Sequence, residues 1–327
     1  MISFPLYSLF SGEVYDFSTI KNGELFLSYP RNFNDPFDGA ILIDLNEFIK
    51  EYLSRRFGED IVTIILEFSN DKSEDVFSLL SRYKTVKTSI PICAEIYPEE
   101  FDFFSNIDVN KLKEDCLNLY NDYIIKIKEF RNEYGVACFT SNLPENNMVM
   151  WAHYANNYKG FCCKFEFDYY NVNTNRDTNG TANILKHFHK ITYTNKIPCL
   201  NAKKLLDCPL DKIKTSKYIN GFVKKALTLK HKQWKYENEY RIIIHKDSKF
   251  FEKTFNKNNC GFKIAFPYLK SLYINYEKCV DEASIVDIAT THNIKYYGLT
   301  ASQNGAILVN DTSVINLHNI LLEAGHI

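Results

Sequence analysis

The sequence predicts an α+β protein whose core is a mixed or antiparallel sheet, with one helical insertion. Strand-like segments occur near the start of the chain and again throughout its second half, and helices interrupt them without the regular alternation of a doubly wound sheet. No internal repeat or Pro/Ser-rich linker divides the 327 residues, of which 45% are hydrophobic. We therefore expect a single domain over residues 1–327, with the insertion at about residues 45–130.

The first strands are predicted at residues 4–10 and 24–29, because apolar and aromatic residues dominate both segments and turn residues flank them. A short helix is expected at 16–20, the pair Asn22-Gly23 predicts a turn, and Pro30 closes the second strand.

The insertion is predicted from apolar residues that recur at a spacing of three to four, which is typical of amphipathic helices. The clearest examples are Ile61, Ile64, Ile65 and Phe68, then Val76, Leu79 and Leu80, and then Leu112, Cys116, Leu119, Tyr123 and Ile124.

Strands are expected to resume after Gly135. The segments with strand character are 136–140, 160–167, 191–193, 240–245, 262–266, 272–274 and 295–299, and a strand or helix is expected to close the chain. Helices are expected at 148–155, 210–229 and 282–292, and loops at 169–181 and 246–259.

Composition excludes several classes of protein. A net charge of -1 with 24% charged residues is typical neither of a disordered chain nor of a globally basic nucleic-acid binder. No uncharged apolar run reaches the roughly 18 residues of a membrane span. Because the first cation is Lys21, the N-terminus lacks the positive region of a signal peptide, and we expect a cytoplasmic protein. The nine cysteines show no zinc-type spacing, so we expect reduced thiols and no metal.

Charge is unevenly distributed along the chain. The segment from Lys203 to Lys235 holds ten lysines against Asp207 and Asp211, whereas the segment from Glu95 to Asp122 holds eight acidic residues against two lysines. The basic segment is either a solvated helix face or a surface that contacts nucleic acid or a protein acceptor.

Three polar clusters are candidates for a functional site. The first is the run RNFNDPFD, in which Arg31, Asn34 and Asp35 follow a predicted strand. Asn34 and Asp35 precede a proline, so they either bond their own backbone in a turn or bring amide and carboxylate groups to a cleft.

The second cluster begins where a strand ends in Thr140 and Ser141. A short helix follows with Trp151, His153 and Tyr154, which together offer a flat ring, a titratable group and a phenol. These side chains either belong to the core or line a pocket for a planar ring and a sugar.

The third cluster is the run WKYENEYRIII. If it is a strand, the period of two places Glu237, Glu239 and Arg241 on one face. This face is either an exposed ion-pair network or a site that holds a cationic transition state, and the apolar residues that follow indicate that the strand enters the core.

The order of the motifs FNDPFD, MWAHYANNYKGFC and WKYENEYRI resembles the bacterial family called domain of unknown function 2971, from about Leu6 to Ile244. More distantly, the arrangement is similar to the ADP-ribosyltransferase superfamily. That superfamily has a functional residue on its N-terminal strand, a strand that ends in Ser/Thr, and a late Glu or E-x-E before a strand.

This second resemblance implies an ADP-ribosyltransferase-like fold and an enzyme that uses NAD, with an unknown acceptor and a role as a toxin or phage-defence effector. Glu239 would stabilise the oxocarbenium ion and Glu237 would orient the acceptor. Among the groups implied to bind NAD, Ser141 would bond a ribose or Glu239 and Trp151 or Tyr154 would stack on nicotinamide. The first strand has Tyr7 where those transferases have Arg or His, so Tyr7 or Arg31 would substitute. The remaining implied contacts are Asn34, Asp35, His153 and Arg241.

Two other classes of function remain compatible with the sequence. A metal-dependent phosphodiesterase or nuclease would use Asp35, Asp38, Glu237 and Glu239 to hold Mg²⁺. A non-catalytic module would bind nucleic acid or protein through the basic segment.

Overall fold

The computed structural model describes residues 3–59, 77–78, 108–168, 184, 186–248, 260–279, 281–302 and 305–310. These residues form two compact units, each described separately below. Unit 1 comprises Met1–Gly39, Asn132–Lys196 and Leu227–Ile327, and unit 2 comprises Ala40–Arg131 and Ile197–Ala226. The helical pattern at 61–68, the acidic residues at 95–102, the loop at 169–181 and the end of the chain after residue 310 lie outside the described residues.

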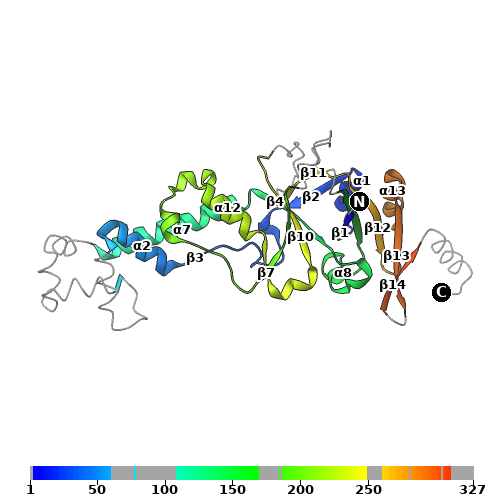
Figure 1. The fold of residues 1–327 in the computed structure, drawn as a ribbon, viewed down its shortest axis with the longest axis horizontal. Helices are drawn as coiled ribbons and strands as arrows, with labels where there is room; N and C mark the ends of the chain where they lie inside the picture. Colours follow the sequence, from blue (N-terminus) through cyan, green and yellow to red (C-terminus); the bar gives the residue numbers. More distant parts are fainter. Residues whose placement is uncertain are drawn as a thin grey trace, which may run out of the picture. The chain divides into compact units, whose positions relative to one another are not determined.

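Unit 1 is built on a ten-stranded sheet (Figure 1). Eight strands follow the order β11-β2-β4-β1-β5-β12-β13-β14, and β10 pairs with both β4 and β6. All pairs are antiparallel except β12 with β13, so the predicted α+β class with a mixed sheet is confirmed. The strands are β1 (Ser3–Phe10), β2 (Glu24–Ser28), β4 (Tyr134–Thr140), β5 (Phe161–Asp168), β6 (Phe188–Lys190), β10 (Glu239–His245), β11 (Gly261–Ala265), β12 (Leu269–Asn275), β13 (Lys295–Ser302) and β14 (Gly305–Asn310).

Short helices and one small parallel pair complete unit 1. The helices are α1 (Val14–Lys21), η1 (Pro30–Asn32), η2 (Pro144–Asn146), α8 (Met148–Tyr154), η4 (Lys232–Glu237) and α13 (Glu282–His292), and the pair is β7 (Thr192–Thr194) with β9 (Leu229–His231). Asp281 caps α13 because its carboxylate accepts the backbone N–H of Ser284 at 2.9 Å.

The main core of unit 1 lies on one face of the sheet. Alternate residues of the strands point into it, among them Leu6, Leu27, Phe139, Ile242 and Phe262, and α1 and α13 contribute Phe17, Ile20, Ile285 and Ile288. The residues between these, such as Tyr7 and Glu239, therefore project from the opposite face, which is the face of interest for function.

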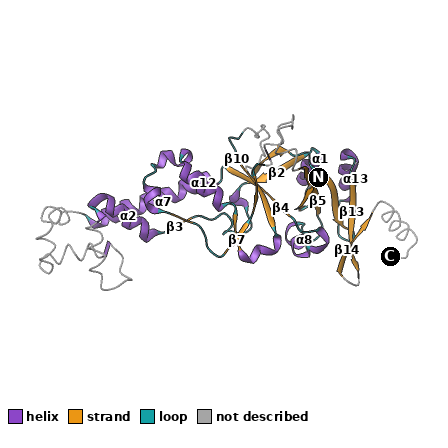
Figure 2. Cartoon of the chain, viewed as in Figure 1, coloured by secondary structure: helices purple, strands orange, loops and turns teal. Residues whose placement is uncertain are grey.

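Unit 2 is mainly helical (Figure 2). It holds α2 (Leu45–Phe57), α7 (Val109–Arg131), α11 (Ala202–Leu206), η3 (Leu210–Thr215), α12 (Lys217–Ala226) and the parallel pair β3 (Leu42–Ile43) with β8 (Cys199–Leu200). Phe48 packs edge-on against the rings of Tyr120 and Tyr123, at centroid distances of 5.3 and 5.9 Å. The described part of the predicted insertion is helical, and residues 197–226 join it.

The helix predicted over residues 210–229 is wrong in its continuity. The chain forms η3, begins α12 only at Lys217 and turns into strand β9 at Leu229. Ser216 separates the two helices, because its hydroxyl accepts the N–H of Ile219 at 3.3 Å.

The described residues bear on the state of the cysteines and on membrane-spanning helices. The eight described cysteines are all free thiols. No helix within the described ranges is long and apolar enough to span a bilayer.

Candidate functional site

A cavity of about 420 Å³ lies within unit 1, where strands β1 and β2 diverge from β4. β1 pairs with β4 only at Tyr7↔Thr140, and β2 pairs with β4 only at Ser28↔Val136. The opening is lined by the strands, by residues after η1 and by α8. The polar and aromatic lining residues are Tyr7, Ser8, Phe10, Asp16, Phe26, Ser28, Asn32, Phe33, Asn34, Asp38, Cys138, Phe139, Thr140, His153, Tyr154, Lys230, Glu237 and Glu239.

Three of these residues are aligned across adjacent strands. Tyr7 of β1 lies opposite Thr140 of β4, and Thr140 in turn lies opposite Glu239 of β10. Residues paired in this way point to the same face of a sheet. Positions far apart in the sequence therefore meet in one row at the cavity.

Arg241 joins the first and third sequence clusters. Its guanidinium is fully buried and donates from Nε to Glu239 Oε1 at 2.6 Å. It also forms a bidentate pair with Asp38, with Nη1–Oδ1 and Nη2–Oδ2 distances of 2.7 and 2.5 Å. A further bond to the carbonyl of Leu227, at 2.9 Å, fixes the chain just before β9.

Gly39 allows Asp38 to reach this position. The backbone φ of Gly39 is +63°, and a Cβ at this residue would lie 2.8 Å from Leu227 Cδ2. Any other residue would meet both a left-handed backbone conformation and this contact.

Lys230 stands among three carboxylates. Its Nζ lies 2.5 Å from Glu237 Oε2, 3.0 Å from Glu239 Oε2 and 3.7 Å from Asp38 Oδ2. Together with Arg241 it balances two of the three negative charges, so the cluster has a formal charge of -1. A buried cluster of this kind is stable only when nearly every charge is paired, and here each carboxylate has a cationic partner.

The two glutamates of the E-x-E run, Glu237 and Glu239, both contact Lys230 but lie on different elements. The prediction that Glu237 lies on the strand is wrong, because Glu237 ends η4 and β10 begins at Glu239. Asn238 between them is left-handed, with φ 46° and ψ 52°, and its side-chain amide donates to Ser141 Oγ at 2.6 Å. The turn is held from β4, since the hydroxyl of Thr140 donates to the carbonyl of Glu237 at 2.6 Å.

The pKa values of the two glutamates move in opposite directions. Burial raises the pKa of Glu239, but Arg241 and Lys230 outweigh burial and lower it to about 2. For Glu237, burial and the nearby negative charge of Glu239 outweigh Lys230, so its pKa is raised. At neutral pH Glu239 is the fixed anion of the cluster, and Glu237 is the carboxylate more ready to take up a proton.

Tyr154 completes the site from α8. Its hydroxyl donates to Glu237 Oε1 at 2.6 Å. Burial raises the pKa of Tyr154 far above its usual range, so the phenol stays protonated and remains a donor. His153, the preceding residue, also lines the cavity.

The structure brings together most of the predicted site residues. Those that line the cavity are Tyr7, Asn34, His153, Tyr154, Glu237 and Glu239, and Arg241 lies directly behind Glu239.

Besides Arg241, four predicted residues do not line the cavity. Arg31 lies over the ring of Tyr29 at 5.2 Å, and Asp35 accepts the N–H of Phe37 at 2.9 Å, as a turn residue does. Ser141 bonds Asn238 instead. Trp151 is buried, because its ring stacks on Tyr158 and its N–H donates to the carbonyl of Pro144 at 2.9 Å.

Sequence reasoning missed three contributors. Lys230 was one lysine among ten in a basic segment, and nothing local distinguishes it. Thr140 precedes the chosen Ser141 by one residue, and only the strand register shows which hydroxyl faces Glu239. Tyr193, on β7, accepts the backbone N–H of Glu239 at 2.8 Å, a contact that no motif signals.

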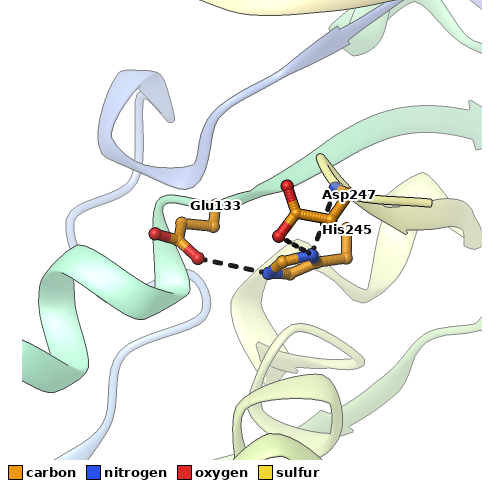
Figure 3. A group of neighbouring side chains, drawn as sticks. All are labelled: Glu133, His245 and Asp247. Atoms are coloured by element: carbon orange, nitrogen blue, oxygen red, sulfur yellow. Dashed lines mark hydrogen bonds and ion pairs between the residues drawn. The ribbon is translucent and has the colours of Figure 1, made fainter. Parts of the chain in front are cut away.

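A second group of titratable side chains lies elsewhere in unit 1 (Figure 3). His245 Nε2 faces Glu133 Oε2 at 3.3 Å, and its Nδ1 lies 3.6 Å from Asp247 Oδ2. These three residues are close enough to hold a metal ion. However, the N–H of Asp247 donates to Nδ1 at 3.3 Å and Lys246 binds the other oxygen of Glu133 at 3.1 Å. Internal contacts therefore already engage His245 Nδ1 and one oxygen of Glu133.

Comparison with protein families matches residues 150–242 to the model described as "Protein of unknown function (DUF2971)". The match begins within α8, at Met150, and contains the whole run from Lys230 to Arg241, and so includes most of the charged cluster. The predicted resemblance to this family is confirmed over residues 150–242, whereas the FNDPFD motif lies outside the match. Comparisons with curated proteins and with solved structures found no match.

Proposed function

We propose that this protein is an ADP-ribosyltransferase-like enzyme that uses NAD as substrate and acts as a toxin or phage-defence effector in the cytoplasm. The observation that supports the proposal best is the row Tyr7, Thr140 and Glu239 across three adjacent strands at one cavity. This is the order of elements that the superfamily resemblance implies, with Thr140 in place of Ser141 as the hydroxyl residue.

The cavity is suited in size and lining to the nicotinamide and ribose of NAD. A volume of about 420 Å³ falls in the usual range of small-molecule sites. Phe33 and His153 offer flat rings for nicotinamide in place of Trp151, while Asn32 and Asn34 offer amides for the carboxamide and the ribose hydroxyls.

The charged cluster would stabilise the transition state. When the bond between ribose C1′ and the nicotinamide nitrogen breaks, its electron pair leaves with nicotinamide and the ribose becomes an oxocarbenium ion. A fixed site with a formal charge of -1 stabilises such a cation. Glu239 supplies the negative charge nearest the strand row, and Arg241 and Lys230 hold it in place without reorganisation.

Glu237 would accept a proton from the acceptor. The acceptor forms the new bond to C1′ and must lose a proton, and Glu237 is prepared to take it because its pKa is raised. Tyr154 and Lys230 bind its two oxygens and so fix its orientation.

The metal-dependent phosphodiesterase alternative is less well supported. The ammonium group of Lys230 lies among the oxygens of Asp38, Glu237 and Glu239, where a divalent ion would need to be. Asp35, the fourth proposed ligand, bonds the backbone of its own turn.

The test is nicotinamide release from NAD, measured with and without cell lysate as a source of acceptor. Glu239→Gln should lower release about 10²-fold or more, as expected when a preorganised electrostatic group is removed. Glu237→Gln should spare slow hydrolysis but impair transfer to acceptor. Glu133→Gln, which removes a paired carboxylate outside the cavity, is the matched control and should behave as wild type.

Melting curves show whether each variant folds. If Glu239→Gln does not fold, Asn34→Ala and His153→Ala test the cavity without removing an ion pair, and both should weaken NAD binding. Wild-type protein that releases no nicotinamide with or without lysate, or a folded Glu239→Gln variant as active as wild type, would overturn the proposal.

A further inference from the structure

The turn that leads into β10 carries aromatic and basic side chains, of which all but the half-buried Trp234 are exposed. We call Lys232, Trp234, Lys235 and Tyr236 of η4 the basic aromatic turn; it is the yellow segment before β10 in Figure 1. Tyr236 is 40% exposed and both lysines are exposed. Neither lysine forms an ion pair with a described residue.

The aromatic rings of this turn continue toward the cavity. The rings of Trp234 and Tyr236 lie 6.0 Å apart, and the ring of Trp234 lies 6.2 Å from that of His153. Since His153 lines the cavity, the basic aromatic turn lies beside it. The amide of Asn142, which donates to the carbonyl of Tyr236 at 2.6 Å, keeps the turn against the end of β4.

We propose that the basic aromatic turn binds single-stranded nucleic acid. The exposed ring of Tyr236 offers its face to an unpaired base, whose own face is hidden in a duplex, and the two lysines complement the phosphates. The charge at this surface is favourable because Glu237, the one carboxylate of η4, is buried and paired with Lys230. That the bound strand also supplies the acceptor rests on the proposed function, whereas the binding itself does not.

The proposed binding surface is only one part of the basic segment from Lys203 to Lys235. Most of its lysines lie in unit 2, where Lys203 pairs with Glu59 and Lys212 with Asp211. Lys217 and Lys224, on α12, are exposed like Lys232 and Lys235, and neither pairs with a described residue. They therefore provide a control that matches the charge but has no exposed tyrosine ring beside it.

The experiment measures binding of fluorescently labelled dT20, U20 and a 20-base-pair duplex by anisotropy over a range of salt concentrations. Wild type should bind the single strands and bind duplex less tightly, and the DNA and RNA arms show which sugar is preferred. Lys232→Ala/Lys235→Ala should reduce the slope of log affinity against log salt by about 1.4, at roughly 0.7 for each phosphate contact. Tyr236→Ala should weaken binding about tenfold. Lys217→Ala/Lys224→Ala should change affinity less than about twofold.

Several results would overturn the inference: no binding of either single strand at low salt, duplex bound as tightly as single strand, or the α12 double variant losing as much affinity as the η4 double variant. Retained affinity in Tyr236→Ala would also overturn it. The assay contains no NAD, so failure of the proposed function leaves its outcome unchanged and the two failures are distinguishable.

Discussion

The opposite pKa shifts of Glu237 and Glu239 predict that two isosteric substitutions, two residues apart, affect stability very differently. Lowering the pKa of Glu239 from its ordinary 4.5 to about 2 corresponds to about 3 kcal/mol of stability, at about 1.4 kcal/mol per pKa unit. Glu239→Gln removes this contribution and also turns an amide toward Arg241 or Lys230. For unit 1, a loss of about 3 kcal/mol corresponds to a melting temperature lower by roughly 6–12 °C.

Glu237→Gln should cost little at pH 7 or stabilise the fold. Its raised pKa means that the folded protein favours the neutral form of this side chain, so an ionised Glu237 opposes folding above its unfolded pKa. The bond from the Tyr154 hydroxyl to an oxygen at position 237 can persist in the amide.

The dependence on pH gives a second check. A carboxylate whose folded pKa is lowered stabilises the protein above its unfolded pKa, and this contribution is lost as the pH falls through 4.5 toward 2. The cost of Glu239→Gln relative to wild type should therefore fall from about 3 kcal/mol at pH 7 to about 1 kcal/mol at pH 3.

Urea unfolding followed by tryptophan fluorescence is the assay, because both tryptophans, Trp151 and Trp234, belong to unit 1. A cost below about 1 kcal/mol for Glu239→Gln at pH 7 would refute the argument. So would a cost that stays constant down to pH 3, or an equal cost for Glu237→Gln.

Three more substitutions or reactions should give defined results. Arg241→Met should destabilise unit 1 by about 3–5 kcal/mol in urea unfolding. Arg241→Lys should not restore the lost stability, because only the planar guanidinium reaches Asp38 and Glu239 together. Full stability of the lysine variant would contradict this. Gly160→Ala should prevent normal folding, because the added Cβ would lie 2.0 Å from the carbonyl oxygen of Phe10. Gly221 lies on α12 with open space around its Cβ position, so Gly221→Ala should stabilise unit 2 by about 1 kcal/mol in thermal melts, since alanine favours the helix more than glycine does. Cys138 is accessible at the cavity, but the loss of bulk water around its thiol and the charge of Glu239 raise its pKa. Iodoacetamide should therefore label Cys138 more slowly at pH 7.5 than the exposed Cys199, as measured by peptide mass spectrometry. Equal labelling rates would contradict this.

Local patterns were sufficient to predict most of the strands of unit 1. Apolar and aromatic runs bounded by Gly, Pro and Asn identify β2, β4 and β10 to within a few residues. The helix over 210–229 failed because lysine and apolar spacing continues across Ser216, and periodicity alone does not detect a cap inside such a run.

The site was predictable only where chemistry is concentrated in a motif. The ENEYR run identified Glu239 and Arg241, but Lys230 is chemically identical to its neighbouring lysines and is distinguished only by the carboxylates around it. Trp151 and Tyr154 lie three residues apart on the same short helix. Trp151 packs in the core, whereas Tyr154 reaches Glu237. Such choices depend on tertiary packing rather than on local sequence.

The pairing of Asp38 with Arg241 spans 203 positions of the chain, with consequences for synthesis. At about 5–20 residues per second, a ribosome needs about 10–40 s to advance from one to the other. During that interval the nascent chain contains the aspartate without its guanidinium partner, and β10 has not yet added Glu239 to the row. A message truncated before codon 239 would therefore yield a polypeptide that lacks the assembled charge cluster, however much of the remaining sheet had formed.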